Sequence, residues 1–362
     1  MLTQAHARSW PDEDALASEF FAPVTESLST PILRNIQDAA NRLCNGQVVA
    51  FPTETVYGLG ACAFDVHAVA RVFDAKQRPE FDPLIVHVAD LEGVRSVTSS
   101  LPDLACRLAE RFWPGPMTLV LPKSDAVPDL VTAGLPGVGV RIPQHPIALE
   151  LLGAVGGPVA APSANQFGCV SPTTADHVLQ GLDGRIDAIL DGGACSVGLE
   201  STVISLMNDE PVVLRLGGLA LESIEELSGP VSLARPDSDR PDAAQPAPGM
   251  LSRHYAPKTA IRLIDCDGSP GTDFGEMRPA LLTWGNHQED EGTFVAVQCL
   301  SSTDNLSECA ANFFAALRCL DAGNPDVIIA RRFPEKGLGR ALNDRLERAC
   351  GSRDPDGSGG GE

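Results

Sequence analysis

Lysine is scarce in this chain of 362 residues, because only four of its 27 basic residues are lysines. A compact ammonium and a planar guanidinium are not interchangeable, so a lysine here marks a position that arginine does not fill equally well. Lys76 is the lysine of most interest, since Arg78 follows two residues later and Pro79 comes next. Two fixed cations at the end of a predicted helix suit phosphates. The alternative is that they only balance the negative end of the helix dipole.

Positive charge as a whole is also in deficit, because 48 acidic residues give a net charge of −21 and a pI near 4.6. A surface this acidic repels phosphate backbones and anionic headgroups. The composition therefore argues against stable nucleic-acid binding and against attachment to anionic membranes. A small anionic ligand remains possible if the basic residues gather where it binds.

Long apolar runs and CxxC pairs are absent. No stretch reaches the ~18 residues that span a bilayer, and the first residues lack the basic-then-apolar pattern of a secretory signal. The ten cysteines are scattered through apolar stretches. We therefore expect reduced, buried thiols rather than disulfides or zinc ligands, and a cytoplasmic location.

Apolar residues are plentiful, at 43% of the chain, which excludes a disordered protein. Short apolar runs alternate with helical patterns, which predicts an α/β fold with a largely buried sheet. A first helix is expected from Pro31, with Thr30 as its N-cap, and a second helix after Asp65. We expect strands at 48–51, 84–88, 117–121, 138–142, 158–161, 187–190, 202–206 and 211–214, and helices near 102–112, 146–153 and 173–181.

A change of composition after the first 229 residues predicts a domain boundary. Six prolines fall between Pro230 and Pro257, which indicates a stiff linker. Beyond it, strands at 260–264, 279–284, 293–297 and 326–330 alternate with helices at 304–320 and 338–349. The predicted organisation is a flexible extension (1–29), a first domain (30–229), a linker (230–257), a smaller α/β domain (258–350) and a flexible tail (351–362).

Polar motifs lie next to several predicted strands. The PTETVYG segment at 52–58 places two hydroxyls and a carboxylate after a strand, a usual ligand position in open α/β sheets, although ordinary turn chemistry is the alternative. Ser163 and Asn165 are expected to point the same way from an extended loop, unless they form a local turn. Arg141 lies within a buried strand, where an arginine needs a partner that a ligand carboxylate or phosphate would supply.

Gly58, Gly60 and Ala63 form a G-x-G-x-x-A pattern, which is one mark of a dinucleotide-binding turn. PTETVY separates the strand from the first glycine, and the helix begins only at Asp65. A glycine-rich turn at a packed corner is therefore the favoured interpretation. No Walker A sequence is present, which argues against a P-loop kinase or GTPase.

Together these motifs resemble a known family. FPTETVYGLG, AKQRPEFDPLIVHV, FWPGPMTLVL, VGVRIPQHP, APSANQFGCVSPT, GLESTVI and LRLGG appear in the order and spacing of the YrdC-like domain. PGMLSRHYAPK and the closing GLGRALNDRLERAC resemble the longer members with a second domain. These are threonylcarbamoyl-AMP synthases, and the resemblance covers residues 31 to about 350.

The resemblance implies a fold, a reaction and partners. The fold is a twisted, mixed, open YrdC-like sheet with flanking helices, followed by a smaller Rossmann-like α/β domain. The reaction joins L-threonine, bicarbonate or CO2, and ATP into threonylcarbamoyl-AMP and pyrophosphate, which makes the enzyme a nucleotidyltransferase. Other proteins then transfer the product to tRNA position 37. Magnesium would arrive on the ATP phosphates, with no protein metal site.

The resemblance also assigns roles to residues of this sequence. Around the phosphates and the carbamate it implies a catalytic set of Lys76, Arg78, Ser163 and Asn165. For ATP it adds Asp82, Gly137, Ala161, Ser171, Arg215 and Tyr255. For threonine it implies Thr53, Thr55, His87, Arg141 and Ser201. Three positions depart from the usual pattern: Gln77 replaces glycine, Asp82 replaces asparagine, and Gly137 stands where a threonine is frequent. A carboxylate at position 82 is unfavourable near a triphosphate unless it faces magnesium or solvent.

Two other functions compete. A non-catalytic RNA-binding module would need a basic concave surface, against which the charge of −21 argues. A carbamoyl-transfer enzyme of hydrogenase maturation would need further domains and CxxC pairs that this chain does not have. The linker ends in Ser252-Arg253-His254-Tyr255, and we expect it to fold over the cleft with Tyr255 against the nucleotide. The alternative is that it only anchors the second domain.

Overall fold

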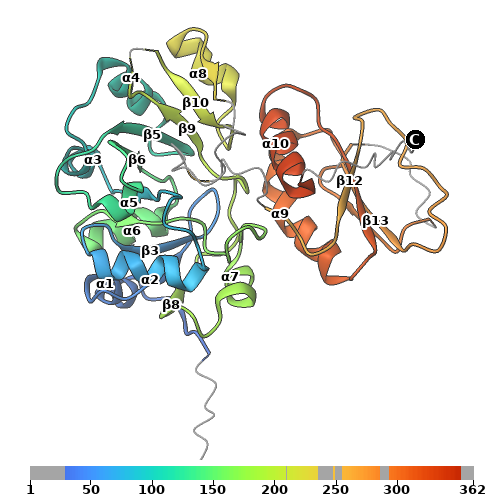
Figure 1. Cartoon of the computed structure of the whole chain (residues 1–362), viewed down its shortest axis with the longest axis horizontal. Helices are drawn as coiled ribbons and strands as arrows, with labels where there is room; N and C mark the ends of the chain where they lie inside the picture. The colour runs from blue at the N-terminus through green and yellow to red at the C-terminus, as the bar shows by residue number, and fades with distance from the viewer. Residues whose placement is uncertain (1–28, 209, 235–247, 249–254, 286–292, 352–362) are drawn as a thin grey trace, which may run out of the picture.

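The computed structural model describes residues 29–208, 210–234, 248, 255–285 and 293–351 (Figure 1). The first part of the chain forms a mixed sheet of eleven strands in the order β1-β8-β2-β3-β7-β4-β6-β5-β9-β10-β11. Its strands are β1 (Ile32–Leu33), β2 (Val49–Phe51), β3 (Gly58–Cys62), β4 (Ile85–His87), β5 (Met117–Pro122), β6 (Gly137–Arg141), β7 (Val159–Ala160), β8 (Ala188–Leu190), β9 (Thr202–Ser205), β10 (Val212–Arg215) and β11 (Ser232–Leu233).

Helices flank this sheet, and short ones connect several of its strands (Figure 1). They are α1 (Ile36–Cys44), α2 (Val66–Lys76), α3 (Leu91–Val97), α4 (Asp103–Phe112), α5 (Asp129–Thr132), α6 (Pro146–Val155), α7 (Ala175–Leu182) and α8 (Leu221–Ser228). This part of the chain is called the first domain below.

The second domain is a smaller α/β unit with four parallel strands in the order β12-β15-β13-β14. Its elements are β12 (Ile261–Ile264), β13 (Pro279–Thr283), β14 (Ala296–Cys299), α9 (Leu306–Ala322), β15 (Val327–Arg331) and α10 (Leu338–Cys350). The fold class expected from the sequence is confirmed in both domains. Among the described residues, no helix is long and apolar enough to cross a membrane.

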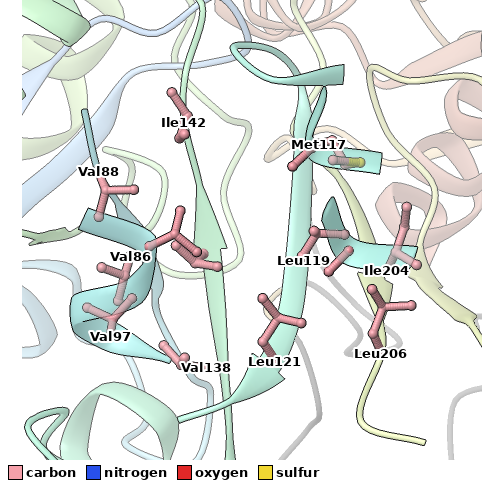
Figure 2. Packing of buried hydrophobic residues seen from close by; sticks show 14 of the residues in the cluster. Val86, Val88, Val97, Met117, Leu119, Leu121, Val138, Ile142, Ile204 and Leu206 are labelled. Carbon is pink, nitrogen blue, oxygen red and sulfur yellow. The ribbon is translucent and has the colours of Figure 1, made fainter. Parts of the chain in front are cut away.

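The main core of the first domain lies on one face of the sheet (Figure 2). Val86 of β4 and Val140 of β6 are register partners, and both are fully buried in this core with Leu119 of β5. Burial of each such side chain contributes roughly 1.5–3 kcal/mol. Because neighbouring residues of a strand point to opposite faces, the core leaves His87 and Arg141 to the other face.

The predicted first helix is wrong in its start. Ile32 and Leu33 form β1, which pairs in parallel with β8, and α1 begins only at Ile36 with Asn35 as its N-cap. Thr30 instead accepts a hydrogen bond from the Gly184 amide. Pairing at the sheet edge supplies hydrogen bonds to the backbone carbonyls on either side of Ile32, which overrides the helical start signal of Thr30 and Pro31.

The expected glycine-rich turn at 58–63 is also wrong, because Gly58–Cys62 is strand β3. A Cβ at Gly60 would lie 2.9 Å from the Phe51 ring and from Val159. The glycine therefore serves close packing within the sheet, not a turn. No helix or strand was predicted from the sequence at α3, α5, α8 or β11, which are short. Of the expected linker, β11 pairs with β10, whereas most of 235–254 lies outside the described residues.

The expected burial of the cysteines does not hold throughout. All ten cysteines are free. Cys195 and Cys309 are buried, whereas Cys44, Cys169, Cys299 and Cys319 are exposed. Apolar neighbours in sequence thus did not predict burial of each thiol.

The two domains meet along α9 and α10 (Figure 1). Leu199 and Tyr255 are buried in one cluster with Phe313, Phe314 and many other residues of the second domain. The backbones also approach closely, because a Cβ at Gly198 would lie 2.3 Å from the carbonyl oxygen of Ala310. A glycine is therefore required at position 198 for the domains to close.

We predict that Gly198→Ala lowers the free energy of unfolding by about 1–3 kcal/mol more than Gly193→Ala does. Both glycines have similar positive φ angles, 74° and 79°, but a Cβ at Gly193 meets nothing within 4 Å. The backbone strain is therefore common to both variants, and the clash is not. Denaturant unfolding of the two variants measures the difference. Equal losses would show that the close approach is unimportant.

Candidate active site

A cavity lies on the face of the first-domain sheet opposite the main core. Ile85 and His87, two residues apart on β4, both line it, so their side chains share one face. His87 is the register partner of Arg141 in the parallel pair β4–β6, which brings these two predicted residues together. The lining residues are Thr53, Thr55, Val56, Gly58, Arg78, Ile85, His87, Arg141, Ala161, Pro162, Ser163, Glu200, Ser201, Arg215, Pro248 and Tyr255.

Most residues expected at the site line this cavity, from both the threonine set and the ATP set. Five do not line it: Lys76, Asp82, Gly137, Asn165 and Ser171. Gly137 lines a small neighbouring cavity that Pro248 also borders. The other four contact residues that line the main cavity or the backbone next to them. Ser252, Arg253 and His254 lie outside the described residues.

Arg141 already has protein partners, whereas we expected a ligand to supply the partner of this arginine in a buried strand. Its guanidinium lies 2.6 Å from Glu54 Oε1, donates to Thr55 Oγ1 at 2.8 Å and donates to the Gly115 carbonyl. Glu54 is 3% exposed, so the pair is buried. The carboxylate of PTETVYG was expected near a ligand, but its pairing with Arg141, 87 positions later, was not predicted from the sequence.

His87 stays neutral at physiological pH. Burial, followed by the nearby Arg141 charge, lowers the pKa of His87 from 6.5 to about 3. The ring also packs edge-on against Phe51, with 5.8 Å between centroids. A neutral imidazole can donate one hydrogen bond and accept another, which suits a hydroxyl-bearing ligand.

Arg78 is held by its own loop. Its Nη2 lies 2.8 Å from Asp82 Oδ2, and it donates to the carbonyls of Asp82 and Pro83. Asp82 is fully buried, and burial raises its pKa against the opposing effect of Arg78. The departure at position 82 therefore has a structural role: the carboxylate faces neither solvent nor the cavity but fixes the guanidinium that lines it.

Lys76 is not a solvent-facing cation at a helix end. It is 1% exposed, and its Nζ donates to the backbone carbonyls of Ser163 and Asn165, at 2.6 and 2.5 Å. Burial, followed by the neighbouring Arg78 charge, lowers its pKa well below the usual value. Lys76 thus anchors the loop that carries Ser163 into the cavity.

Ser163 and Asn165 do not point the same way. Ser163 lines the cavity, whereas Asn165 donates from Nδ2 to the carbonyls of Gln166 and Cys169 in its own loop. Its buried Oδ1 has no hydrogen-bond partner among the residues that the structure describes. The alternation rule failed because residues 163–165 follow β7 in a loop that β-bridges only at Ser163, to Gly58.

Arg215, the last residue of β10, links two other residues that line the cavity. It donates to the backbone and Oγ of Ser201, and its Nη1 donates to the carbonyl of Pro248 at 2.9 Å. Pro248 belongs to the predicted linker, so part of that segment does fold over the cavity. The space left is about 50 Å³, well below the roughly 300–1,000 Å³ of typical ligand pockets. Entry of a nucleotide therefore requires the covering residues to shift.

Two residues near the cavity were not expected from the sequence. Glu200 lines it and accepts a hydrogen bond from Ser171 Oγ at 2.5 Å. Arg345 of α10 lies 2.9 Å from the second oxygen of Glu200. Both residues stood inside motifs that carried the family resemblance, GLESTVI and GLGRALNDRLERAC, but nothing in either motif indicated that they meet.

Comparison with known proteins agrees with this geometry. The family described as "Telomere recombination" matches residues 41–217, and the one described as "Threonylcarbamoyl-AMP synthase, C-terminal domain" matches residues 219–351. The threonylcarbamoyl-AMP synthase of Bacillus subtilis is 44% identical over 345 residues, which cover 92% of this chain and 98% of that protein. The chain belongs to the threonylcarbamoyl-AMP synthase family.

A second relative and a solved structure show a similar extent of similarity. The threonylcarbamoyl-AMP synthase of Pyrococcus abyssi is 43% identical and covers 88% of this chain and 94% of that protein. The crystal structure of Sua5 from Pyrococcus abyssi, complexed with L-threonine, matches with a TM-score of 0.80 over 87% of this chain and 94% of that chain. The match spans both domains, so the chain is an enzyme of the longer, two-domain kind.

We predict that His87 makes stability depend on pH in a defined window. The folded state binds a proton at His87 only near pH 3, whereas the unfolded chain binds one near pH 6.5. Stability is therefore fully present above about pH 6.5 and falls by up to about 1.4 kcal/mol per pH unit below it. Denaturant unfolding of the wild type between pH 6.5 and 5 should show a steeper loss than His87→Gln. Parallel curves would contradict a buried neutral His87.

Proposed function

We propose that this chain makes threonylcarbamoyl-AMP from L-threonine, bicarbonate or CO2, and ATP, with release of pyrophosphate, and so acts as a nucleotidyltransferase. The observation that carries the proposal is one cavity whose lining includes residues expected for threonine and residues expected for ATP, which are called its threonine end and its nucleotide end below. In this reaction the threonine amine captures CO2 as a carbamate and loses a proton. A carbamate oxygen then attacks the α-phosphorus, and pyrophosphate leaves.

The threonine end is formed by Arg141, Thr55, His87 and Ser201, with Thr53 hydrogen-bonded to Thr55 at 2.8 Å. The threonine carboxylate would approach a guanidinium that Glu54 and Thr55 already orient. Orientation before binding lowers the entropy lost when the substrate is captured. A neutral His87 and the hydroxyl of Ser201 offer polar partners for the threonine hydroxyl. Rejection of serine then depends on one methyl group, worth only about 1–3 kcal/mol.

The nucleotide end is formed by Arg78, Ser163, Arg215 and Tyr255, with the backbone of Ala161. Charge develops on the phosphates as pyrophosphate leaves, so cations fixed in advance stabilise the transition state without reorganisation. Asp82 fixes Arg78, and Lys76 holds the loop of Ser163 and Asn165. Ser171 would act through its hydrogen bond to Glu200, and Gly137 through its backbone.

Magnesium would accompany ATP and would neutralise part of the charge on its phosphates. No group of three or more His, Cys, Asp or Glu side chains that could hold a metal occurs in the described part of the chain. Asp82, the carboxylate beside the phosphate-binding residues, is already paired with Arg78. We therefore propose that the ion is held by the nucleotide, and that the protein contributes only fixed cations and hydroxyls.

The charges around the cavity favour a small-molecule enzyme over an RNA-binding module. Arg78, Arg141 and Arg215 line an enclosed cavity, whereas the chain as a whole carries a net charge of −21. Three guanidinium groups are thus gathered at one enclosed cavity of an acidic chain, which favours a small anionic substrate over a phosphate backbone. The product would pass to separate proteins that modify tRNA position 37.

Threonine-dependent pyrophosphate release tests the proposed function. The purified chain is incubated with ATP, magnesium and bicarbonate, with and without L-threonine, and pyrophosphate is measured. We expect release only with threonine, together with an adenylate that contains the threonine carbons. Release at the same rate without threonine, or none at all, would contradict the proposal.

We predict that Lys76→Ala lowers kcat/KM by about 10²–10³-fold, as expected when one fixed donor near the phosphates is lost. Lys76→Arg should recover little, because a planar guanidinium does not fit a site that is 1% exposed and bonded to two carbonyls. Lys123→Ala is the matched control, since its ion pair with Asp129 lies at the surface. Wild-type turnover of Lys76→Ala would show that its contacts with the loop of Ser163 and Asn165 are not needed for catalysis.

A further inference from the structure

A side chain of the second domain supports the wall of the cavity in the first. Arg345 of α10 is fully buried, and its Nε lies 2.9 Å from Glu200 Oε2. Its guanidinium carbon also lies 4.8 Å from the centroid of the Tyr255 ring. Glu200 and Tyr255 both line the cavity, whereas Arg345 does not. One side chain thus contacts two parts of the wall that are far apart in sequence.

The remaining donors of Arg345 are also engaged. Nη2 donates to the carbonyl of Leu216 at 2.9 Å, and Nη1 donates to Asp344 at 2.6 Å. Leu216 directly follows Arg215, the residue that binds Ser201 and Pro248. The planar fork therefore fixes the strand end from which Arg215 projects. The guanidinium thus holds three oxygen acceptors while it lies over the Tyr255 ring, an arrangement that a lysine ammonium cannot provide.

Tyr255 needs such support, because its backbone has a φ of 63°. This left-handed conformation costs a bulky residue on the order of 1–3 kcal/mol and persists only where the surroundings impose it. Arg345 lies against the ring, and Phe314 of α9 packs on it with 5.7 Å between centroids. Both contacts come from the second domain.

Glu200 needs Arg345 for a different reason. Ser171 Oγ donates to one oxygen of Glu200, and Arg345 donates to the other. Glu200 is 6% exposed and lies in the wall where ATP phosphates would arrive. Without Arg345 a buried, uncompensated carboxylate would face an anionic ligand, which is unfavourable both for the fold and for binding.

We propose that Arg345 is a positioning residue for ATP, acting from the second domain through Tyr255 and Glu200. This inference rests on the proposed function. It gives the second domain a part in nucleotide binding, although Arg345 does not itself line the cavity. Its contacts do not include Arg141 or His87, so we expect a smaller effect on threonine, which Arg345 reaches only through Ser201, the neighbour of Glu200.

The test is Arg345→Lys, which keeps a positive charge beside Glu200 and so keeps the fold, but loses the contact with the ring and the fork. We expect the KM for ATP to rise about tenfold, as for loss of one buried cation–π contact, and the KM for threonine to stay within about twofold. The dissociation constant of ATP from calorimetry should change by the same factor. In a Tyr255→Leu background, Arg345→Lys should add much less, because the residue through which it acts is gone.

Arg340→Gln is the matched control, because Arg340 also lies on α10 and reaches the first domain, at 3.8 Å from Glu222, but far from the cavity lining. It should leave both KM values unchanged. Equal rises in both KM values, or additive effects of Arg345→Lys and Tyr255→Leu, would reduce Arg345 to a structural contact. Wild-type protein that lacks threonine-dependent pyrophosphate release would instead contradict the proposed function, and the ATP calorimetry would still decide on Arg345.

Discussion

A buried ion pair between Glu200 and Arg345 is the interaction on which the closed form of this protein depends. It joins the two domains at the wall of the cavity, where Glu200 also accepts from Ser171 and Arg345 packs on Tyr255. Taking either charge from water alone would cost several kcal/mol, so each residue requires the other. Docking of the second domain on the first therefore also fixes the wall of the cavity.

Two further buried ion pairs fix arginines that line the cavity. Arg141 is paired with Glu54, and Arg78 with Asp82, in each case at 2.8 Å or less. Of the three arginines that line the cavity, two are thus fixed by carboxylates before any substrate arrives, and Arg215 is fixed by the oxygens of Ser201 and Pro248. The arrangement reduces the reorganisation needed when charge develops on the phosphates, which is how preorganised sites lower a barrier. The cost is that a substrate carboxylate or phosphate must share its arginine.

The sequence predicted the strands and helices with strong periodicity, and most residues that line the cavity. It failed where tertiary pairing overrides local signals. Thr30 reads as an N-cap, but β1 pairs with β8 there, and Gly60 reads as a turn, but its strand packs on Phe51. The partners of the buried arginines were missed for the same reason, because Glu54 follows β2 and Arg141 ends β6, and only the folded sheet brings them together. The role of Asp82 became evident only from its contact with Arg78.

The central claim is that both domains form one ATP-binding unit. Hydrogen exchange measured by mass spectrometry tests it most directly, with peptides from α10 and from residues 198–203 followed in the free enzyme and with ATP and L-threonine. The account predicts that exchange slows in both regions together, because Arg345 connects them through Glu200 and Tyr255. Protection confined to the first domain, with α10 exchanging as in the free enzyme, would contradict it.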